Sequence, residues 1–232
     1  MKLKLKIFRY DPTSGKKGYD SFEIDYEEGM TFLTAFQRVK ELFDPSLSFR
    51  HFCRAGICGT CTVFINRFPK LACKEQVLPY VLSGEEVLIE PMENFPLIKD
   101  LAVDHESVIE RMKSFRTWVR EFSGDVRIPP EVSKRIEKAS DCILCSACQS
   151  YCPQVLEEEY AGPLFFAKIY RFLEDPRDSD KEGRLKLALE KGHLYHCLSC
   201  DKCNSSCPKE VEPATLIREL MTYIGGDGKA NC

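Results

Sequence analysis

The stretch Cys142-Ile-Leu-Cys145-Ser-Ala-Cys148-Gln-Ser-Tyr-Cys152-Pro153 places four cysteines at the spacing C-x2-C-x2-C-x3-C-P. The chain repeats this spacing 55 residues later with Cys197, Cys200, Cys203, Cys207 and Pro208. Thiolates two residues apart on a tight loop can reach three corners of one metal centre, whereas a fourth Cys followed by Pro points elsewhere. We therefore expect two related loops, each of which opens onto a helix.

Bacterial ferredoxins use this spacing to hold cubane iron–sulfur clusters, and in two-cluster ferredoxins the fourth Cys ligates the other cluster. A four-thiolate zinc site is an alternative, and disulfides are another. Zinc gives no reason for eight cysteines in two identical runs with a Pro after each. The rule predicts one cluster on Cys142, Cys145, Cys148 and Cys207, and a second on Cys197, Cys200, Cys203 and Cys152.

The composition is that of a globular protein without a membrane span. Of the 232 residues, 44% are hydrophobic and 30% are charged, and the net charge is −3. This charge argues against nucleic acid as a partner. No apolar stretch approaches the roughly 18 residues that cross a bilayer. Thirteen cysteines without an apolar signal segment after Met1 favour metal ligands over disulfides.

Residues 1–100 are expected to form one domain with a small α+β fold. Alternation of charged and apolar residues predicts strands, and a turn cluster at 11–15 joins the first two as a hairpin. Thr31 can cap the helix that follows. The expected elements are strands at 2–8, 21–26, 62–65 and 87–89 and a helix over 32–43.

A third group of cysteines lies inside this domain. Its first three members obey C-x4-C-x2-C, which is the plant-type [2Fe–2S] spacing. Two glycines between them suit a loop that brings backbone N–H groups close to cluster sulfurs. His51 could ligate as in a Rieske centre, but no second His stands at a matching spacing. The predicted ligands are Cys53, Cys58, Cys61 and Cys73.

Residues 101–232 are expected to form a helical second domain. Trp118 lies beside an apolar stripe and is expected in the core. The chain shows no Gly-rich phosphate loop after a strand and no catalytic arrangement of side chains, so we expect no catalytic residue. Cys232 stands in a tail and is not expected to be a ligand. The expected helices cover 105–122, 131–140, 163–173, 181–193 and 213–223.

The order of these motifs resembles the iron–sulfur subunit of succinate dehydrogenase and fumarate reductase. The similarity covers nearly the whole chain. It implies an α+β protein in which a plant-type (β-grasp) [2Fe–2S] ferredoxin domain precedes an all-helical two-cluster ferredoxin domain. The matching segments are Cys53-Arg-Ala-Gly-Ile-Cys58-Gly-Thr-Cys61, Leu71-Ala72-Cys73, Pro91-Met-Glu-Asn-Phe-Pro96-Leu-Ile-Lys-Asp100-Leu, Ala161-Gly162-Pro163, Asp175-Pro-Arg177-Asp178 and Cys207-Pro208-Lys209.

The resemblance implies an electron-transfer subunit of an oxidoreductase complex. Electrons would pass through a [2Fe–2S] and two further clusters, between an FAD-bearing flavoprotein and a quinone-linked or other redox partner. The flavoprotein would carry the succinate/fumarate chemistry, and this chain would bind no dicarboxylate. The complex would be cytoplasmic and peripheral on the inner face of the cytoplasmic membrane. A membrane-anchor subunit, or a cysteine-rich subunit resembling heterodisulfide reductase, would hold it there.

Two departures from the family pattern refine this expectation. Most members carry an apolar or small residue at the position of Cys200 and hold a [3Fe–4S] cluster, whereas a fourth thiolate favours a [4Fe–4S] cluster of lower potential. Members with a quinone site carry a Trp soon after the Pro matching Pro153 and a His directly after the Cys matching Cys197. Here Gln154 and Leu198 follow those residues, which predicts that the usual quinone pocket is missing. Two alternatives stay open: a relay for a different flavoprotein, such as a thiol-driven fumarate reductase, and a zinc-stapled interaction module.

Overall fold

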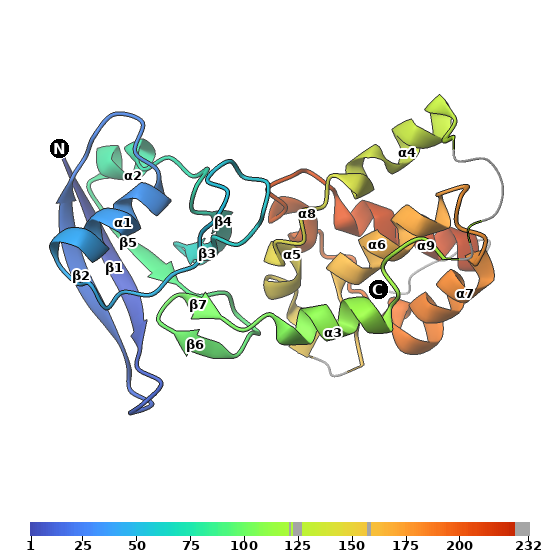
Figure 1. Cartoon of the computed structure of the whole chain (residues 1–232), viewed down its shortest axis with the longest axis horizontal. Coiled ribbons are helices and arrows are strands. Elements are labelled where there is room, and N and C mark those ends of the chain that lie inside the picture. Colours follow the sequence, from blue (N-terminus) through green and yellow to red (C-terminus); the bar gives the residue numbers. More distant parts are fainter. Residues whose placement is uncertain (121, 123–126, 157–158, 226–232) are drawn as a thin grey trace. The chain divides into compact units, whose positions relative to one another are not determined.

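The computed structural model describes the chain except for residues 121, 123–126, 157–158 and 226–232 (Figure 1). It divides into two compact units. The first comprises Met1–His105 with the segment Ile143–Ser150, and the second comprises Glu106–Cys142 with Tyr151–Cys232. A sheet in the first unit and helices in the second confirm the α+β class. The expected domain boundary between residues 100 and 101 stays a prediction, and Cys232 lies outside the described residues.

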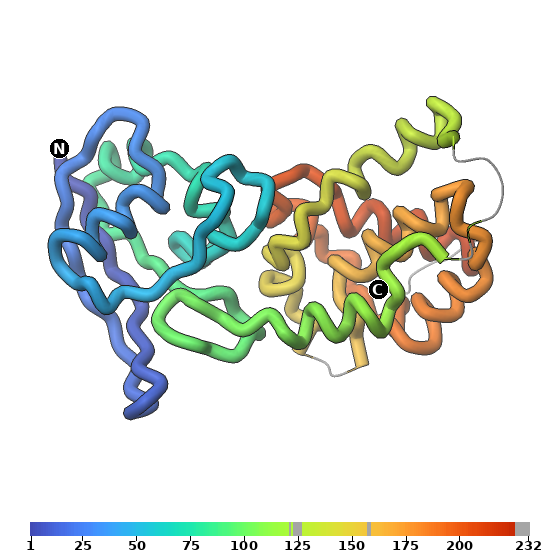
Figure 2. The backbone as a smooth tube through the Cα atoms, viewed as in Figure 1, coloured from blue at the N-terminus to red at the C-terminus, as the bar shows by residue number. Residues whose placement is uncertain are grey.

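The first unit is built on a five-stranded sheet in the order β2-β1-β5-β3-β4. Leu3, Leu5 and Ile7 are fully buried because alternate side chains of a strand share one face. The first two strands form an antiparallel hairpin (Figure 2, dark blue), and β1 also pairs in parallel with β5. The strands are β1 (Lys2–Tyr10), β2 (Lys17–Asp25), β3 (Thr62–Ile65), β4 (Phe68–Leu71) and β5 (Glu86–Glu90).

The helix α1 (Phe32–Leu42) packs its apolar face into the core of the first unit. Its cap is the expected one, since the side chain of Thr31 accepts a hydrogen bond from the backbone N–H of Thr34. Phe36 and Val39 lie on one face and join the core that contains β1. Several short elements were not predicted, namely β4, α2 (Leu78–Ser83), β6 (Leu97–Lys99) and β7 (Ala102–Val103).

A buried carboxylate fastens the β6–β7 pair to the sheet. Asp100, which joins these two strands, is 1% exposed and accepts a hydrogen bond from the Arg9 guanidinium at 3.0 Å. The backbone N–H groups of Tyr10 and Ser48 donate to the same carboxylate at 3.0 and 2.9 Å. The charge of Asp100 is therefore both paired and hydrogen-bonded, as a buried charge requires.

His105, directly after this pair, is expected to make the first unit less stable in mild acid. Burial lowers the pKa of His105, and the positive charge of Arg50 lowers it further. The unfolded imidazole has a pKa of about 6.5, so below that pH the unfolded state binds more protons and stability is lost. Anaerobic urea midpoints measured from mildly alkaline to mildly acidic pH should decline less steeply in His105→Gln than in wild type. Equal slopes would contradict this account.

The second unit is helical around α6 (Pro163–Leu173). This helix begins with Pro at its first position, where the absent N–H leaves no helical hydrogen bond unmade, and buries most of its residues. No helix among the described residues is long and apolar enough to cross a membrane. The other helices are α3 (Glu106–Ser114), α4 (Pro130–Ser140), α7 (Lys181–Lys186), the π-helical η2 (Leu187–Lys191), α8 (Lys202–Ser205) and α9 (Pro213–Ile224), with 3-10 turns η1 (Pro153–Leu156) and η3 (Leu194–His196).

The expected helix over 105–122 is wrong beyond Ser114, where α3 ends. Arg116 adopts a left-handed φ of 50°, and Trp118 is 51% exposed rather than placed in the core. Residue 121 of the expected helix lies outside the described part of the chain. The carbonyl groups of Arg116 and Trp118 accept hydrogen bonds from the guanidinium of Arg184, so side-chain contacts replace the helical ladder here.

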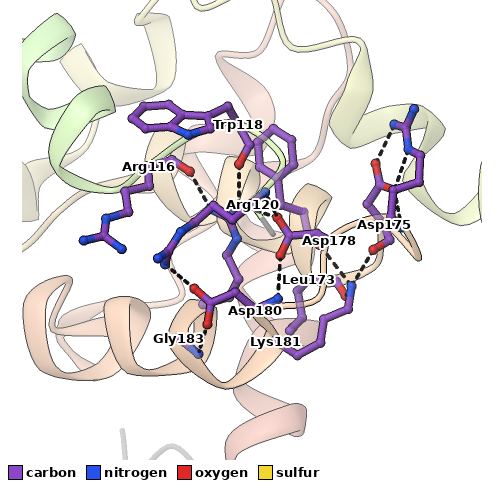
Figure 3. A network of polar contacts seen from close by, with 12 residues as sticks. Arg116, Trp118, Arg120, Leu173, Asp175, Asp178, Asp180, Lys181 and Gly183 are labelled. Carbon is purple, nitrogen blue, oxygen red and sulfur yellow. Dashed lines mark hydrogen bonds and ion pairs between the residues drawn. The ribbon is translucent and has the colours of Figure 1, made fainter. Parts of the chain in front are cut away.

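This segment is held by a buried ion pair that Arg184 forms with Asp178, and Asp178 is labelled in Figure 3. Both side chains are fully buried, and their charged atoms lie 2.5 Å apart. Asp178 also accepts the backbone N–H of Arg120 at 2.9 Å. Beside it, Asp180 caps α7 by accepting the backbone N–H of Gly183 at 3.1 Å. The segment after α3 therefore depends on charged residues far along the chain.

Candidate metal centres

The four cysteines of the plant-type motif gather in the first unit. Cys53, Cys58 and Cys61 lie on the loop before β3, and Cys73 follows β4, which pairs with β3. Cys61 and Cys73 are buried, whereas Cys53 and Cys58 are partly exposed. Burial raises the pKa of the Cys61 thiol to about 12; the backbone N–H of Cys73 lowers it, and the neighbouring thiols of Cys73 and Cys58 raise it. The structure therefore brings these four thiol groups together.

Backbone donors surround the sulfur of Cys53. The N–H groups of Ala55 and Ile57 each donate to its Sγ at 3.4 Å, and they lower the pKa of the Cys53 thiol to about 6. Arg54 and Gly56 have left-handed φ values of 57° and 72°. Such a backbone turns successive N–H groups inward and favours an anion. The loop stabilises a thiolate, which is the form that binds metal.

Three cysteines of the second run share one hollow in the second unit with Cys152, namely Cys197, Cys200 and Cys203. Cys152 and Cys203 are buried, Cys197 is partly exposed and Cys200 is exposed. Burial raises the pKa of the Cys203 thiol to about 12, and the charges of Cys197, Cys152 and Cys200 raise it further. The structure therefore brings these four thiol groups together. They are the four that were predicted to share one cluster, with Cys152 coming from the first run.

The cysteines of the other predicted cluster form two pairs. Cys142 and Cys207 pack in the second unit against residues of α4, α6 and α9. Burial raises the pKa of Cys207, although the N–H of Val211 donates to its Sγ at 3.4 Å and lowers it. Cys145 and Cys148 belong to the segment counted with the first unit, where Cys145 packs against the core.

The two C-x2-C-x2-C-x3-C-P runs adopt the same backbone conformation. Leu144 and Ser146 have left-handed φ values of 57° and 61°, and their counterparts Ser199 and Asp201 have 51° and 55°. The short helices α5 (Ala147–Ser150) and α8 begin at matching positions. Left-handed backbone costs about 1–2 kcal/mol for each such residue, and strain of this kind persists where a function requires it.

Sequence reasoning missed two hydroxyl groups near these sulfurs. The Thr60 hydroxyl donates to the Cys58 Sγ at 3.2 Å, and a hydroxyl residue inside a cysteine loop is a signal that could have found it. Tyr160 is fully buried and lines the same hollow as Cys197. Burial raises its pKa, so the hydroxyl keeps its proton. No spacing in the sequence marks Tyr160.

The structure also bears on the histidine and zinc alternatives. His51 is exposed, and its ring packs on Phe49 with centroids 5.6 Å apart. No three of the described Cys, His, Asp and Glu side chains lie close enough to hold a single metal ion. An iron–sulfur cluster is larger than one ion, so its thiolates stand further apart than zinc ligands do.

Two protein-family models match the chain. A "2Fe-2S iron-sulfur cluster binding domain" matches residues 4–110, and a "4Fe-4S dicluster domain" matches residues 138–211. Together with the fold and the grouped thiols, they define an iron–sulfur protein in which a [2Fe–2S] domain precedes a helical dicluster domain.

Curated relatives match nearly the whole chain. The fumarate reductase iron–sulfur subunit of Escherichia coli is 31% identical over 94% of this chain and 91% of its own length. A mitochondrial succinate dehydrogenase iron–sulfur subunit of Arabidopsis thaliana is 31% identical over 96% of this chain and 75% of its own. One subunit of the fumarate reductase (CoM/CoB) of Methanothermobacter marburgensis is 36% identical over 97% of this chain, which spans only 45% of that relative.

The chain belongs to the family of the iron–sulfur subunits of succinate dehydrogenase and fumarate reductase, as its motifs predicted. Its fold also matches a chain of the Mycobacterium smegmatis Sdh1 complex with a TM-score of 0.80 at 24% identity, and the match covers 98% of both chains.

Proposed function

We propose that this chain is the electron-transfer subunit of a succinate dehydrogenase or fumarate reductase complex and holds three iron–sulfur clusters. The observation that carries the proposal is the presence of three sets of four cysteines on a chain of this family. The clusters would supply one-electron redox chemistry, while the chain positions and tunes them. The proposed ligands are Cys53, Cys58, Cys61 and Cys73 for [2Fe–2S], Cys142, Cys145, Cys148 and Cys207 for the first [4Fe–4S], and Cys152, Cys197, Cys200 and Cys203 for the third cluster.

A buried hydroxyl within the first cysteine run supports a cluster there. The Oγ of Ser146 is buried and has no hydrogen-bond partner among the residues that the structure describes. Buried polar groups are nearly always hydrogen-bonded. A cluster sulfur beside Cys145 and Cys148 would supply the acceptor that Ser146 requires.

The third cluster is proposed to be [4Fe–4S] rather than [3Fe–4S]. Cys200 lines the same hollow as Cys152, Cys197 and Cys203, and its charge acts on the Cys203 thiol. It is thus placed among the other three thiols, and the fourth iron would not lack a ligand. A complete set of four thiolates favours the complete cluster.

The proposed partners follow from the family. A flavoprotein with FAD would carry out the succinate/fumarate reaction, and this chain would contribute no catalytic residue to it. Gln154 donates to the carbonyl oxygen of His196 at 3.0 Å, and Leu198 lines the hollow of the second run. These residues stand where quinone-site residues are expected, which favours a cysteine-rich subunit resembling heterodisulfide reductase over an ordinary membrane anchor. Either subunit would hold the complex on the inner face of the cytoplasmic membrane.

A second candidate function is a thiol-driven fumarate reductase. The 36% identity to a subunit of a fumarate reductase (CoM/CoB) favours it, and the absent quinone residues agree with it. In that case the relay would carry electrons from thiol oxidation to fumarate.

Purification of the native complex separates these functions. We expect a flavoprotein to co-purify, and succinate to reduce the clusters or fumarate to reoxidise them under anaerobic conditions. Cluster reduction by a coenzyme M and coenzyme B thiol pair, with no response to succinate, would favour the second candidate. A complex without a flavoprotein would contradict both, and an ordinary haem-bearing anchor without a cysteine-rich subunit would contradict the partner assignment.

The Tyr160→Phe variant is expected to lower the midpoint potential of the third cluster. Hydrogen bonds to cluster sulfurs and their Cys ligands help to set the potential, and a donor stabilises the more negative reduced state. Redox titration followed by EPR measures this shift. Tyr170→Phe is a control, because Tyr170 is a buried tyrosine of the same unit that packs with Cys142 and Cys207 instead of lining the hollow of Cys197. Equal potentials in wild type and Tyr160→Phe would exclude the role of Tyr160.

A further inference from the structure

Two ligand loops of the proposed relay meet in the first unit at Gly59. This residue is buried between Cys58 and Cys61, and its φ is +70°. A Cβ atom on Gly59 would lie 2.6 Å from both Cα and Cβ of Cys145 and 3.0 Å from its backbone nitrogen. Only a residue without a side chain allows this approach.

The segment that contains Cys145 is fixed within the same unit. Ile143 and Cys145 pack against the core of the first unit. At the other end, the Ser150 hydroxyl donates to the carbonyl of Glu93 at 2.7 Å, and the Asn94 amide donates to the carbonyl of Ser150 at 3.0 Å. The segment therefore cannot move away freely to make room for a larger residue.

The Gly59 side of the contact is fixed as well. Its carbonyl accepts a hydrogen bond from the buried Thr62 hydroxyl at 2.7 Å and another from the Thr62 N–H at 3.3 Å. An added methyl group would have to open the contact by about 1 Å, because carbon atoms pack at about 3.5–4.0 Å. The two loops would separate without any change to a cysteine.

We propose that Gly59 is a positioning residue that sets the spacing between the [2Fe–2S] loop and the loop of Cys145. This inference rests on the proposed function, which places Cys58 and Cys61 on one cluster and Cys145 on the next. Electron tunnelling falls steeply with distance, so the spacing of the two loops governs the rate. Each electron that leaves one centre arrives at the other, and no further oxidant or reductant takes part.

Gly56 offers a matched control in the same loop. It is also buried and has nearly the same left-handed φ of +72°, so an alanine bears the same conformational strain at either position. A Cβ on Gly56 would meet only the flexible side chain of Lys74, 2.7 Å from Cγ, and not the loop of Cys145. The two alanine variants therefore differ in whether the ligand loops must separate.

The test compares wild type, Gly59→Ala and Gly56→Ala as full-length proteins with their clusters. Iron and sulfide contents establish loading, EPR relaxation of the reduced [2Fe–2S] signal reports the nearby reduced [4Fe–4S] cluster, and pulse reduction gives the transfer rate. We expect weaker relaxation enhancement and severalfold slower transfer in Gly59→Ala than in Gly56→Ala, which carries the same backbone strain without the contact to Cys145. Equal relaxation and rates in the two variants would overturn the inference.

If Gly59→Ala fails to load its clusters, the measurement on wild-type protein still tests the inference. A fully loaded wild type in which the reduced [2Fe–2S] signal shows no relaxation enhancement would overturn the inference, because the loops would not bring the centres close. Enhancement in wild type, together with loss of clusters in Gly59→Ala but not in Gly56→Ala, would support the contact. A wild type that lacks either signal would instead contradict the proposed function.

Discussion

A Cys203→Ser variant is expected to lose the third cluster and much of the folded second unit. Cys203 is buried and lies near Cys152, Cys197 and Cys200. A serine there would remove one of the four thiolate ligands, and no other side chain would replace it. Metal binding contributes directly to folding, and its loss should lower the thermal stability as well. Iron content should fall from about ten to about six atoms per chain.

Iron and sulfide analysis, combined with thermal unfolding, measures this effect. Cys232→Ser provides the control, because Cys232 lies outside the three cysteine motifs and is expected to retain all clusters. Cys203→Ser with unchanged iron, sulfide and melting temperature would show that the ligand assignment is wrong.

An Asp178→Ala variant is expected to destabilise the second unit by about 3–5 kcal/mol, as removing one partner of a buried ion pair does. Arg184 would keep its charge without exposure to water, although it could still donate to the carbonyls of Arg116 and Trp118. The backbone N–H of Arg120 would lose its acceptor at the same time. The irregular segment after α3 should therefore loosen first.

Anaerobic denaturant unfolding of the loaded protein measures this change, and Glu182→Ala is its control. Glu182 pairs with Lys186 on the surface of α7 at 2.8 Å, with both side chains well exposed. Exposed pairs of this type contribute little to stability, because water screens both charges. Destabilisation by Asp178→Ala that is no larger than that by Glu182→Ala would contradict the importance of the buried pair.

Local sequence patterns predicted the structure correctly where an element depends only on residues that are close together in the sequence. The helix α6 runs from Pro163 to Leu173 as expected, because a Pro start and a continuous apolar face act within one element. The cap at Thr31 and the β1–β2 hairpin have equally local causes. The repeated spacing of the cysteine runs likewise predicted two related loops, and α5 and α8 follow them at matching positions.

Patterns failed where a distant residue decides the conformation. Periodicity extended the helix through Trp118, but Arg184 binds the carbonyls there and stands 66 positions further along the chain. The contact of Gly59 with Cys145 and the placement of Tyr160 beside Cys197 are also tertiary. Neither follows from spacing, because each depends on how separate segments pack.

The most direct test of the proposed relay is low-temperature EPR of the anaerobically purified chain before and after dithionite, with iron and sulfide analysis. We expect no [3Fe–4S] signal in the oxidised sample. Reduction should reveal one [2Fe–2S] and two interacting [4Fe–4S] clusters. A strong [3Fe–4S] signal from intact oxidised protein would show that Cys200 is not a ligand, and a colourless preparation rich in zinc would contradict the relay itself.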